Sequence, residues 1–228
     1  MPTKQRRKAG RPLGAVSDET RMRVIEAACK CFSERGYGKT SNQDIARLAG
    51  VTTGALYHYF PSKAELFAAV HGHVQGVLVE FYRRAFAEHT TCLSQLCAGM
   101  EASVADEPEW QPELARFASI ASVEIQRHRE LGDILEADIL GVRKFFTRLI
   151  EAGRARGEIA PDLATEAVVD MIIASFFGLA WLRAQVGSAE EHAAAVRAFQ
   201  RLLRGTVFPG GDVGGNLPGQ HSNGTVSV

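Results

Sequence analysis

TSNQDIARLAGVTTGALYHYFPSKAELF, residues 40–67, contains the start and stop signals of two short helices in quick succession. Ser41, with Asp44 three residues later, is a carboxylate variant of the capping box and predicts where the first short helix begins. Gly50 predicts where it ends, because glycine readily adopts the left-handed backbone that terminates helices. The inward face of this helix is expected to carry Ile45, Ala46 and Leu48.

The second short helix follows almost at once. Thr52 or Thr53 is placed to cap it, and it stops after about seven residues because the residue before Pro61 disfavours helical backbone. Helical spacing divides its side chains into an inward set, Ala55, Leu56 and Phe60, and an outward set, Thr53, Gly54, Tyr57 and His58. Two short helices joined by a glycine turn, with polar tips on the second, indicate a helix-turn-helix unit.

Helices are also expected on both sides of this unit. Upstream, Ser17 or Asp18 caps a helix that Gly36 ends, and downstream Ser62 with Glu65 forms a full capping box that begins a long helix. Later helices are expected at about 91–106, at 113–128, at 130–156, after Pro161 with a nearly all-round apolar part at 168–182, and from Ser188 to Gly205. No strand pattern is present.

The sequence therefore predicts an all-α protein of about nine helices in two domains. The expected divisions are a flexible basic arm at 1–16, a three-helix helix-turn-helix domain at 17–62, a larger helical domain at 63–208 and a disordered tail at 209–228. The tail is assigned as disordered because it is rich in glycine and poor in charge and large apolar residues.

Charge divides along the chain in the same way. Residues 1–72 carry 12 Lys and Arg against 6 Asp and Glu, a net charge of +6, and the remaining residues carry 14 against 20, a net charge of −6. The first part is suited to a polyanion that would repel the rest, although solvated charged faces are the alternative interpretation. The basic residues of the arm can follow phosphates or enter a minor groove: Lys4, Arg6, Arg7, Lys8 and Arg11.

The composition is that of a globular protein, with 46% hydrophobic and 23% charged residues. The longest apolar run, 171–182, is too short to cross a bilayer, and the basic N-terminus has no apolar segment behind it, as a secretory signal would. We therefore expect a cytoplasmic protein without a membrane partner. The four cysteines lack the spacing of metal or redox motifs, so no metal and no cofactor are expected.

In its order of residues, the segment 40–67 resembles the DNA-binding region of the TetR family of one-component transcriptional regulators. The usual run of that family is Thr-x-x-x-Ile-Ala, then Ala-Gly-Val-Ser, then Gly-x-Leu-Tyr-x-His/Tyr-Phe-x-x-Lys-x-x-Leu. The chain matches it in register with Ile45-Ala46, Ala49-Gly50-Val51-Thr52, Gly54, Leu56-Tyr57, Tyr59-Phe60, Lys63 and Leu66. The resemblance fades after about residue 75.

The resemblance implies a DNA-binding surface. Positions that touch DNA in relatives fall on Ser41, Asn42, Gln43, Thr52, Thr53, Gly54, Ala55, Tyr57, His58, Tyr59 and Lys63. Phosphate contacts are expected chiefly from Thr53, Tyr57 and Lys63. Base contacts are expected from Gln43, Gly54, Ala55 and His58. Many members carry histidine where this chain has Tyr59, so the base preference is expected to depend on His58; an exposed His58 without a DNA partner is the alternative.

The resemblance also implies that 63–208 is a ligand-binding and dimerisation domain. Side chains that can line an apolar pocket are Met100, Trp110, Phe117, Phe145, Phe146 and Phe176, although aromatic residues at helical spacing are also typical of plain core. Glu124 interrupts an apolar stripe and must be paired or reach water. It can orient the polar group of a ligand, or it can pair with an arginine such as Arg127 or Arg143.

The helix that is apolar on both sides at 168–182 predicts one face for the core and another for a partner chain. Together with the last helix it is expected to form a four-helix bundle across a two-fold axis. The interface residues expected are Phe177, Trp181, Val196, Phe199 and Leu203. Burial of this helix wholly within one chain is the alternative.

The expected function is that of a transcriptional regulator, associated with the nucleoid, and not an enzyme. A homodimer is expected to bind a palindromic double-stranded operator as a repressor, and to release it when a small, largely apolar effector changes the separation of the recognition helices. The alternatives are an activator of the same family, a helix-turn-helix that contacts protein, and an all-α enzyme or ligand-binding protein. The last is disfavoured because no nucleophile elbow, phosphate loop or paired carboxylate site is found in the sequence.

Overall fold

The computed structural model describes residues 13–104, 112–135, 140–185 and 188–207, and every regular element within them is an α-helix. The helices are α1 (Leu13–Lys39), α2 (Asn42–Ala49), α3 (Thr53–Tyr59), α4 (Lys63–Phe86), α5 (Cys92–Ala102), α6 (Pro112–Arg127), α7 (Arg129–Leu135), α8 (Leu140–Ala155), α9 (Thr165–Gln185) and α10 (Ala189–Leu203). The all-α class is confirmed. The segment expected to be one helix at 130–156 forms two, α7 and α8.

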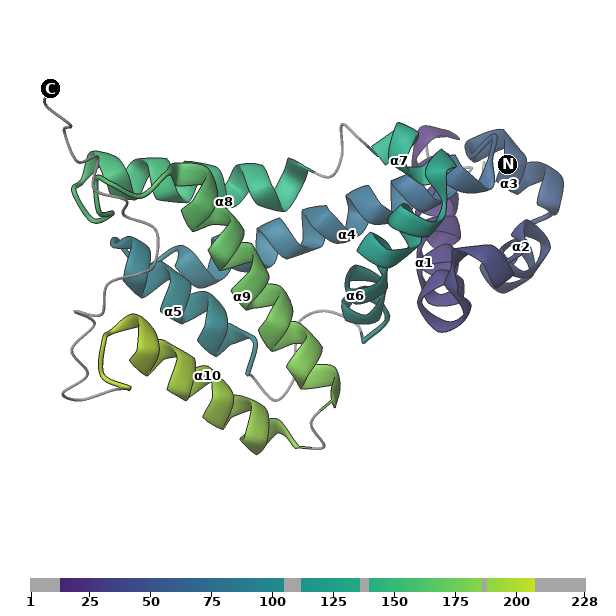
Figure 1. Cartoon of the computed structure of the whole chain (residues 1–228). Helices are drawn as coiled ribbons and strands as arrows, with labels where there is room; N and C mark the ends of the chain where they lie inside the picture. Colours follow the sequence, from purple (N-terminus) through teal and green to yellow (C-terminus); the bar gives the residue numbers. More distant parts are fainter. Residues whose placement is uncertain (1–12, 105–111, 136–139, 186–187, 208–228) are drawn as a thin grey trace, which may run out of the picture.

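The longest connection between the two ends of the molecule is α4 (Figure 1). At its beginning it packs against α1, and further along it packs against α5 and α8. Helices α6 and α7 lie between these groups, against α1 and α4, while α9 and α10 complete the far end. A small N-terminal group of helices and a larger C-terminal group are therefore joined mainly through α4 and α6.

Four of the predicted helix starts are confirmed by a side-chain cap. The hydroxyl groups of Ser41, Thr52, Ser62 and Ser188 each accept a hydrogen bond from the backbone amide three residues later, at 3.1 to 3.2 Å. Each bond satisfies an amide that the helix itself leaves without an acceptor. Gly50 ends α2 in the left-handed conformation, with φ of 67°.

Two local expectations at the N-terminal domain are wrong. Helix α1 begins at Leu13, so Ser17 and Asp18 lie inside it as exposed residues, and the expected end of the arm at residue 16 also falls inside the helix. Residues 1–12 and 208–228 lie outside the described residues. Leu48 is 51% exposed, because α1 and α3 contact the side of α2 that carries Ala49 together with Ile45 and Ala46.

The hydrophobic core runs without a break from one domain into the other. Phe32 of α1 and Phe67 of α4 are fully buried, with ring centroids 5.2 Å apart. Phe67 then meets Phe117 of α6, at 5.0 Å, and further along α4 the ring of Tyr82 lies 5.4 Å from Phe146 of α8. A displacement of α4 or α6 in the larger domain would therefore change the packing of the N-terminal domain directly.

Helix α9 differs from the sequence expectation about membrane spans. By length and composition alone, Thr165–Arg183 is long and apolar enough to cross a membrane, and 22% of the most apolar window is buried within the chain. One side of the helix packs against α8, α10 and α6. The other side exposes Met171, Phe177 and Trp181, and Trp181 is 60% exposed. An exposed apolar face of this kind is typical of a surface that contacts a partner protein or a membrane.

The buried imidazole of His192 predicts a pH dependence of folding. His192 in α10 is 1% exposed, and neither ring nitrogen has a hydrogen-bond partner among the described residues. Burial, followed by the charge of Arg183, holds the pKa of this histidine below its usual value of 6.5. The free energy of unfolding should thus be retained above about pH 6.5, and fall as the pH drops from there toward the lower folded pKa, because the unfolded chain takes up the proton more readily.

Urea unfolding, followed by circular dichroism at about pH 7.5 and 5.5, measures this effect. The variant His192→Leu keeps the apolar contacts and lacks the titrating group, so its free energy of unfolding should change less between the two pH values. Equal changes in the two proteins would show that other groups cause the pH dependence.

Candidate nucleic-acid interface

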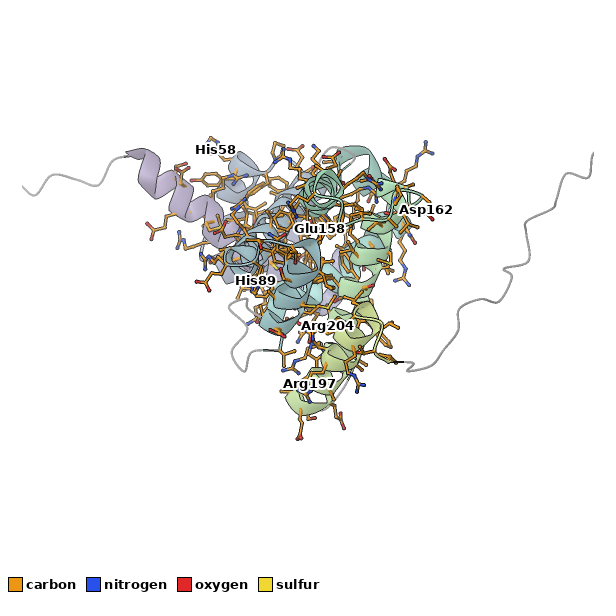
Figure 2. The ribbon with its side chains drawn as sticks, turned by 90° about the vertical axis from the view of Figure 1, so that its left-hand side faces the viewer. His58, His89, Glu158, Asp162, Arg197 and Arg204 are labelled. Carbon is orange, nitrogen blue, oxygen red and sulfur yellow. The ribbon has the colours of Figure 1, made fainter. Side chains whose placement is uncertain are left out.

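The recognition helix of the unit is α3, which is held by its apolar side. Leu56 is fully buried and Phe60 is 3% exposed, and both lie in the core with residues of α1 and α2. On the opposite side Tyr57 is 48% exposed, and His58 lies at the edge of the molecule (Figure 2). The structure thus gives α3 the two faces that helical spacing predicts, one for packing and one for contact with a partner.

Most of the residues expected to contact DNA have accessible side chains or backbone. Ser41, Gln43, Thr52, Gly54, Tyr57 and His58 are exposed, and Asn42, Thr53, Ala55, Tyr59 and Lys63 are partly buried. Nothing but the hydroxyl of Thr52, at 3.9 Å, approaches the place where a Cβ of Gly54 would lie, so a duplex can come close to the backbone there. The hydroxyls of Ser41 and Thr52 are already committed as helix caps.

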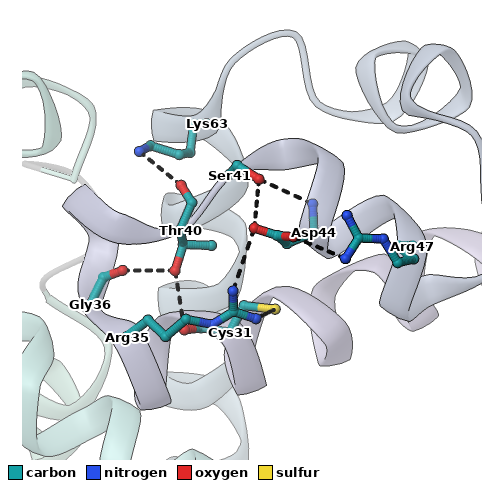
Figure 3. Close-up of polar contacts among 8 residues, drawn as sticks. All are labelled: Cys31, Arg35, Gly36, Thr40, Ser41, Asp44, Arg47 and Lys63. Atoms are coloured by element: carbon teal, nitrogen blue, oxygen red, sulfur yellow. Dashed lines mark hydrogen bonds and ion pairs between the residues drawn. The ribbon is translucent and has the colours of Figure 1, made fainter.

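Polar contacts set α2 relative to α1 (Figure 3). The hydroxyl of Thr40 lies 2.8 Å from the carbonyl oxygen of Gly36 and 3.1 Å from that of Cys31. The carboxylate of Asp44 accepts a hydrogen bond from Ser41 at 2.7 Å and meets Arg35 at 3.4 Å. The Ser41 hydrogen bond, ahead of the charge of Arg35, lowers the pKa of Asp44. These groups fix the first helix that would lie on the duplex.

Lys63 lies differently from the sequence expectation of a phosphate contact. Its ammonium donates to the carbonyl oxygens of Tyr37 at 2.9 Å and of Thr40 at 3.2 Å, and it stands 4.2 Å from the centre of the Tyr37 ring. Burial lowers its pKa, against the opposing charges of Glu130 and Glu124. Lys63, the first residue of α4, thus binds the end of α1. A phosphate could contact its ammonium group only while that group also donates to these carbonyl oxygens.

The turn at the end of α1 also meets α6. Gly36 has φ of 76° and ψ of 168°, a conformation almost restricted to glycine, and a Cβ there would lie 2.7 Å from a carboxylate oxygen of Glu124. The carboxylate of Glu124 pairs with His128 at 3.3 Å, and the His128 ring packs edge-on against Tyr37 at 4.8 Å. The expected pairing of Glu124 with an arginine is corrected to a pairing with histidine one turn later.

A small apolar cavity lies among α4, α6, α8 and α9, with a volume of about 30 Å³. Of the residues expected to line a pocket, Phe146 and Phe176 do so. Met100 and Phe117 are instead buried in the hydrophobic core, and Phe145 is partly buried against that core. Glu124 lies at the turn that ends α1. Trp110 lies outside the described residues. The sequence analysis missed Leu78 and Tyr82 as lining residues, because α4 shows no signal that separates lining from core positions. It also missed Phe177 of α9, which it assigned to the dimer interface alone.

Larger hollows on the surface have a different character. A groove of about 380 Å³ between α1, α2 and α6 is lined by charged side chains such as Arg23, Lys30 and Glu26. A second, of about 500 Å³, carries Arg143 and Glu166 among other charged groups. Ligand sites are typically concave and mostly apolar, so the smaller aromatic cavity is the better candidate for an effector. Among the described residues, no group of three or more His, Cys, Asp or Glu is placed to hold a metal ion.

The residues expected at a dimer interface separate into two groups. Phe177 and Trp181 of α9 are 42% and 60% exposed, as an interface requires. Val196 of α10 is 1% exposed and belongs to the core of the single chain, because α10 turns this side toward α5 and α9. Phe199 and Leu203 are partly buried against the same core. The accessible apolar face is therefore mainly that of α9.

A short helix held by its apolar side, with polar tips facing outward and a preceding helix across it, defines a helix-turn-helix DNA-binding domain. Residues 24–70 match the family model of bacterial regulatory proteins of the tetR family. Through this match the N-terminal domain is similar to the DNA-binding domain of TetR-family regulators. The larger C-terminal helical domain shares its fold with a solved structure.

The relatives are transcriptional regulators. The A-factor receptor protein of Streptomyces griseus is 26% identical over 193 residues, covering 84% of this chain and 65% of that protein. The HTH-type transcriptional regulator TtgR of Pseudomonas putida is 52% identical over 54 residues, 24% of this chain and 26% of that protein. These alignments span less than two thirds of the relatives' own lengths. GusR of Salmonella enterica shares the fold, with a TM-score of 0.68 and 24% identity over 88% of this chain and 99% of that one.

The turn at Gly36 makes a prediction about stability. Gly36→Ala should lower the free energy of unfolding by about 1 to 3 kcal/mol, since the backbone conformation there costs a side chain roughly that much. The new methyl would also displace the Glu124 carboxylate, which is the mobile end of its side chain and can shift at little cost. Gly50→Ala is the matched control, because its φ is also positive but nothing lies within 4 Å of the new Cβ. Its cost should be about 1 kcal/mol. Chemical denaturation of both variants measures the difference, and equal losses would contradict the larger backbone cost at Gly36.

Proposed function

We propose that this chain is a ligand-responsive repressor that binds a palindromic operator as a homodimer. The observation that carries the proposal is the outward face of α3, where Tyr57 and His58 are exposed on the positively charged part of the chain. Residues 1–72 have a net charge of +6, which favours association with DNA phosphates. We retain 17–62 as the DNA-binding domain and 63–208 as the ligand-binding and dimerisation domain.

On the duplex, α3 would lie in the major groove and α2 would cross the backbone. The proposed phosphate contacts come from Thr53 and Tyr57, with Lys63 holding the α1–α2 connection in place for them. The proposed base contacts come from Gln43 of α2 and His58 of α3, which are both exposed. Gly54 has no side chain, so the DNA can approach the backbone of α3 closely there. The ring of His58 packs edge-on near Tyr59, at 5.5 Å, which limits the directions in which it can reach a base.

Dimerisation would cover the exposed side of α9. Phe177 and Trp181 lie one turn apart on this side, Met171 lies nearer the beginning of the helix, and the three side chains are 42 to 60% exposed. A second copy brings the same apolar face, as a two-fold interface requires, and places two recognition helices for two half-sites. The same contact would remove from water the face that makes α9 resemble a membrane span by composition.

Effector control is proposed to act from the cavity among α4, α6, α8 and α9. Two of these helices reach the DNA-binding domain: α4 begins at Lys63, and α6 carries Glu124 and leads into His128 against the α1 turn. The A-factor receptor protein of Streptomyces griseus, which aligns with 84% of this chain, is named a receptor, and this supports a ligand for this site. A ligand that separates the cavity walls would shift both helices, and with them the distance between the two copies of α3.

DNA binding is tested by fluorescence anisotropy with a random-sequence duplex at increasing salt. The protein should bind at low salt and lose affinity steeply as salt rises, because phosphate contacts release counterions. Tyr57→Phe should weaken binding about two- to tenfold for all sequences alike, as loss of one phosphate hydrogen bond would. Gln43→Ala should instead reduce discrimination at one base position, by about 1 to 3 kcal/mol, in a selection from randomised duplexes.

Absence of binding at low salt, or an affinity independent of salt, would refute the DNA-binding proposal. Identical sequence profiles for the Tyr57 and Gln43 variants would refute the division between phosphate and base contacts. Increased transcription of the bound gene, instead of decreased transcription, would replace repression with activation.

The dimer is tested by sedimentation velocity. Trp181→Glu places a charge on the exposed face of α9 and should yield monomers with at least tenfold weaker operator binding, because a buried unpaired charge costs several kcal/mol. Leu163→Glu is the control, since Leu163 is 49% exposed but precedes α9. It should leave the sedimentation coefficient unchanged. Intact dimers in the Trp181 variant would place the interface elsewhere.

A further inference from the structure

The cavity among α4, α6, α8 and α9 has very few polar groups on its walls. Its walls are aliphatic and aromatic, and no charged side chain of the described residues lines it. The two hydroxyl groups on its walls belong to Tyr82 and Ser119. Ser119 already donates to the carbonyl oxygen of Ala115 at 2.9 Å, within its own helix. The hydroxyl of Tyr82 is thus the polar group that remains to meet a ligand.

Tyr82 is 8% exposed and is surrounded by aromatic rings, with centroids 5.1 Å away at Phe176 and 5.4 Å away at Phe146. Its hydroxyl makes no hydrogen bond with any of the described residues. The hydroxyl oxygen of Tyr82 is not among the fully buried atoms that lack a partner. It therefore stays accessible on the cavity wall, where it can donate to a ligand oxygen. Burial also raises the pKa of Tyr82, so the group remains a neutral donor at any physiological pH.

We propose that the effector is an uncharged, ring-containing small molecule with an acceptor oxygen, such as a carbonyl, that binds the hydroxyl of Tyr82. The inference rests on the proposed use of this cavity as the effector site. The rings of Tyr82, Phe146, Phe176 and Phe177 favour a flat apolar body that can lie against their faces or edges. The hydroxyl of Tyr82 then sets the orientation of that body.

An anionic effector is disfavoured by the same walls. A carboxylate or phosphate taken into an apolar cavity needs a cationic partner, and neither lysine nor arginine is among the described residues that line this one. The segments that separate the described ranges within the chain, 105–111, 136–139 and 186–187, also contain no lysine or arginine. Charge therefore separates the effector proposed here from acidic ligands of similar size.

The cavity must widen to accept such a ligand. Its volume of about 30 Å³ holds one or two water molecules, whereas ligand pockets are roughly ten times larger. Phe177 is both a wall residue and 42% exposed, so its ring can rotate outward at lower cost than that of the buried Phe176. Because Phe177 also lies on the proposed dimer face, ligand entry would press on the partner chain.

Three small probes of nearly equal size test the proposal: acetophenone has a ring and a carbonyl, ethylbenzene lacks the carbonyl, and benzoate carries a negative charge. Binding is measured by NMR titration of the full chain up to millimolar probe concentrations. Acetophenone should bind about two- to tenfold more tightly than ethylbenzene, the range expected for one hydrogen bond, and benzoate should bind at least tenfold more weakly than either.

Tyr82→Phe should abolish the preference for acetophenone and leave the affinity for ethylbenzene within about twofold, which also shows that the variant is folded. Tyr57→Phe makes the same substitution on α3 and should leave all three affinities unchanged. An unaltered preference in the Tyr82 variant, equal binding of benzoate, or no binding of either neutral probe would overturn the inference. DNA binding that depends on salt in the wild-type chain, measured separately, would then still support the regulator proposal.

Discussion

The contact between the ammonium of Lys63 and the carbonyl oxygens of Tyr37 and Thr40 joins the parts of this molecule that must stay in register. It ties the first residue of α4 to the end of α1, directly beside the short helices that would meet DNA. The left-handed turn at Gly36 makes this possible, because it brings the chain back from α1 toward α2 and leaves room for Glu124 of α6. Three helices from both domains therefore meet around a few backbone atoms.

This junction gives α4 and α6 a double role. Each helix contributes walls to the apolar cavity and also contacts the α1 turn, so neither can move at one end without consequences at the other. The cavity is small as the structure shows it, and its Tyr82 hydroxyl lacks a partner among the described residues. In the proposed function, a ligand in this cavity would have to alter the packing of both helices. Packed cores deform poorly, so such a change would occur as a discrete shift.

Much of the N-terminal domain was predictable because its signals are local. The caps at Ser41, Thr52 and Ser62, the turn at Gly50 and the stop before Pro61 each act within four residues, where backbone chemistry alone sets the outcome. The two faces of α3 follow from helical spacing for the same reason. The sequence pattern failed at Leu48, since an apolar residue in so short a helix can point to either side and only the positions of α1 and α3 settle which.

The sequence by itself thus determined the all-helical class, the short helices of the helix-turn-helix unit, the outward side chains of α3 and the division of charge. The tertiary arrangement set everything that depends on partners distant in the chain: Lys63 binds carbonyl groups 23 and 26 residues earlier, and Glu124 reaches the turn at Gly36. The tertiary arrangement also decided which aromatic residues line the cavity, Phe146 and Phe176, and that Phe117 lies in the core. Periodicity identifies an apolar face, but the helix that covers that face is chosen by packing over the whole chain.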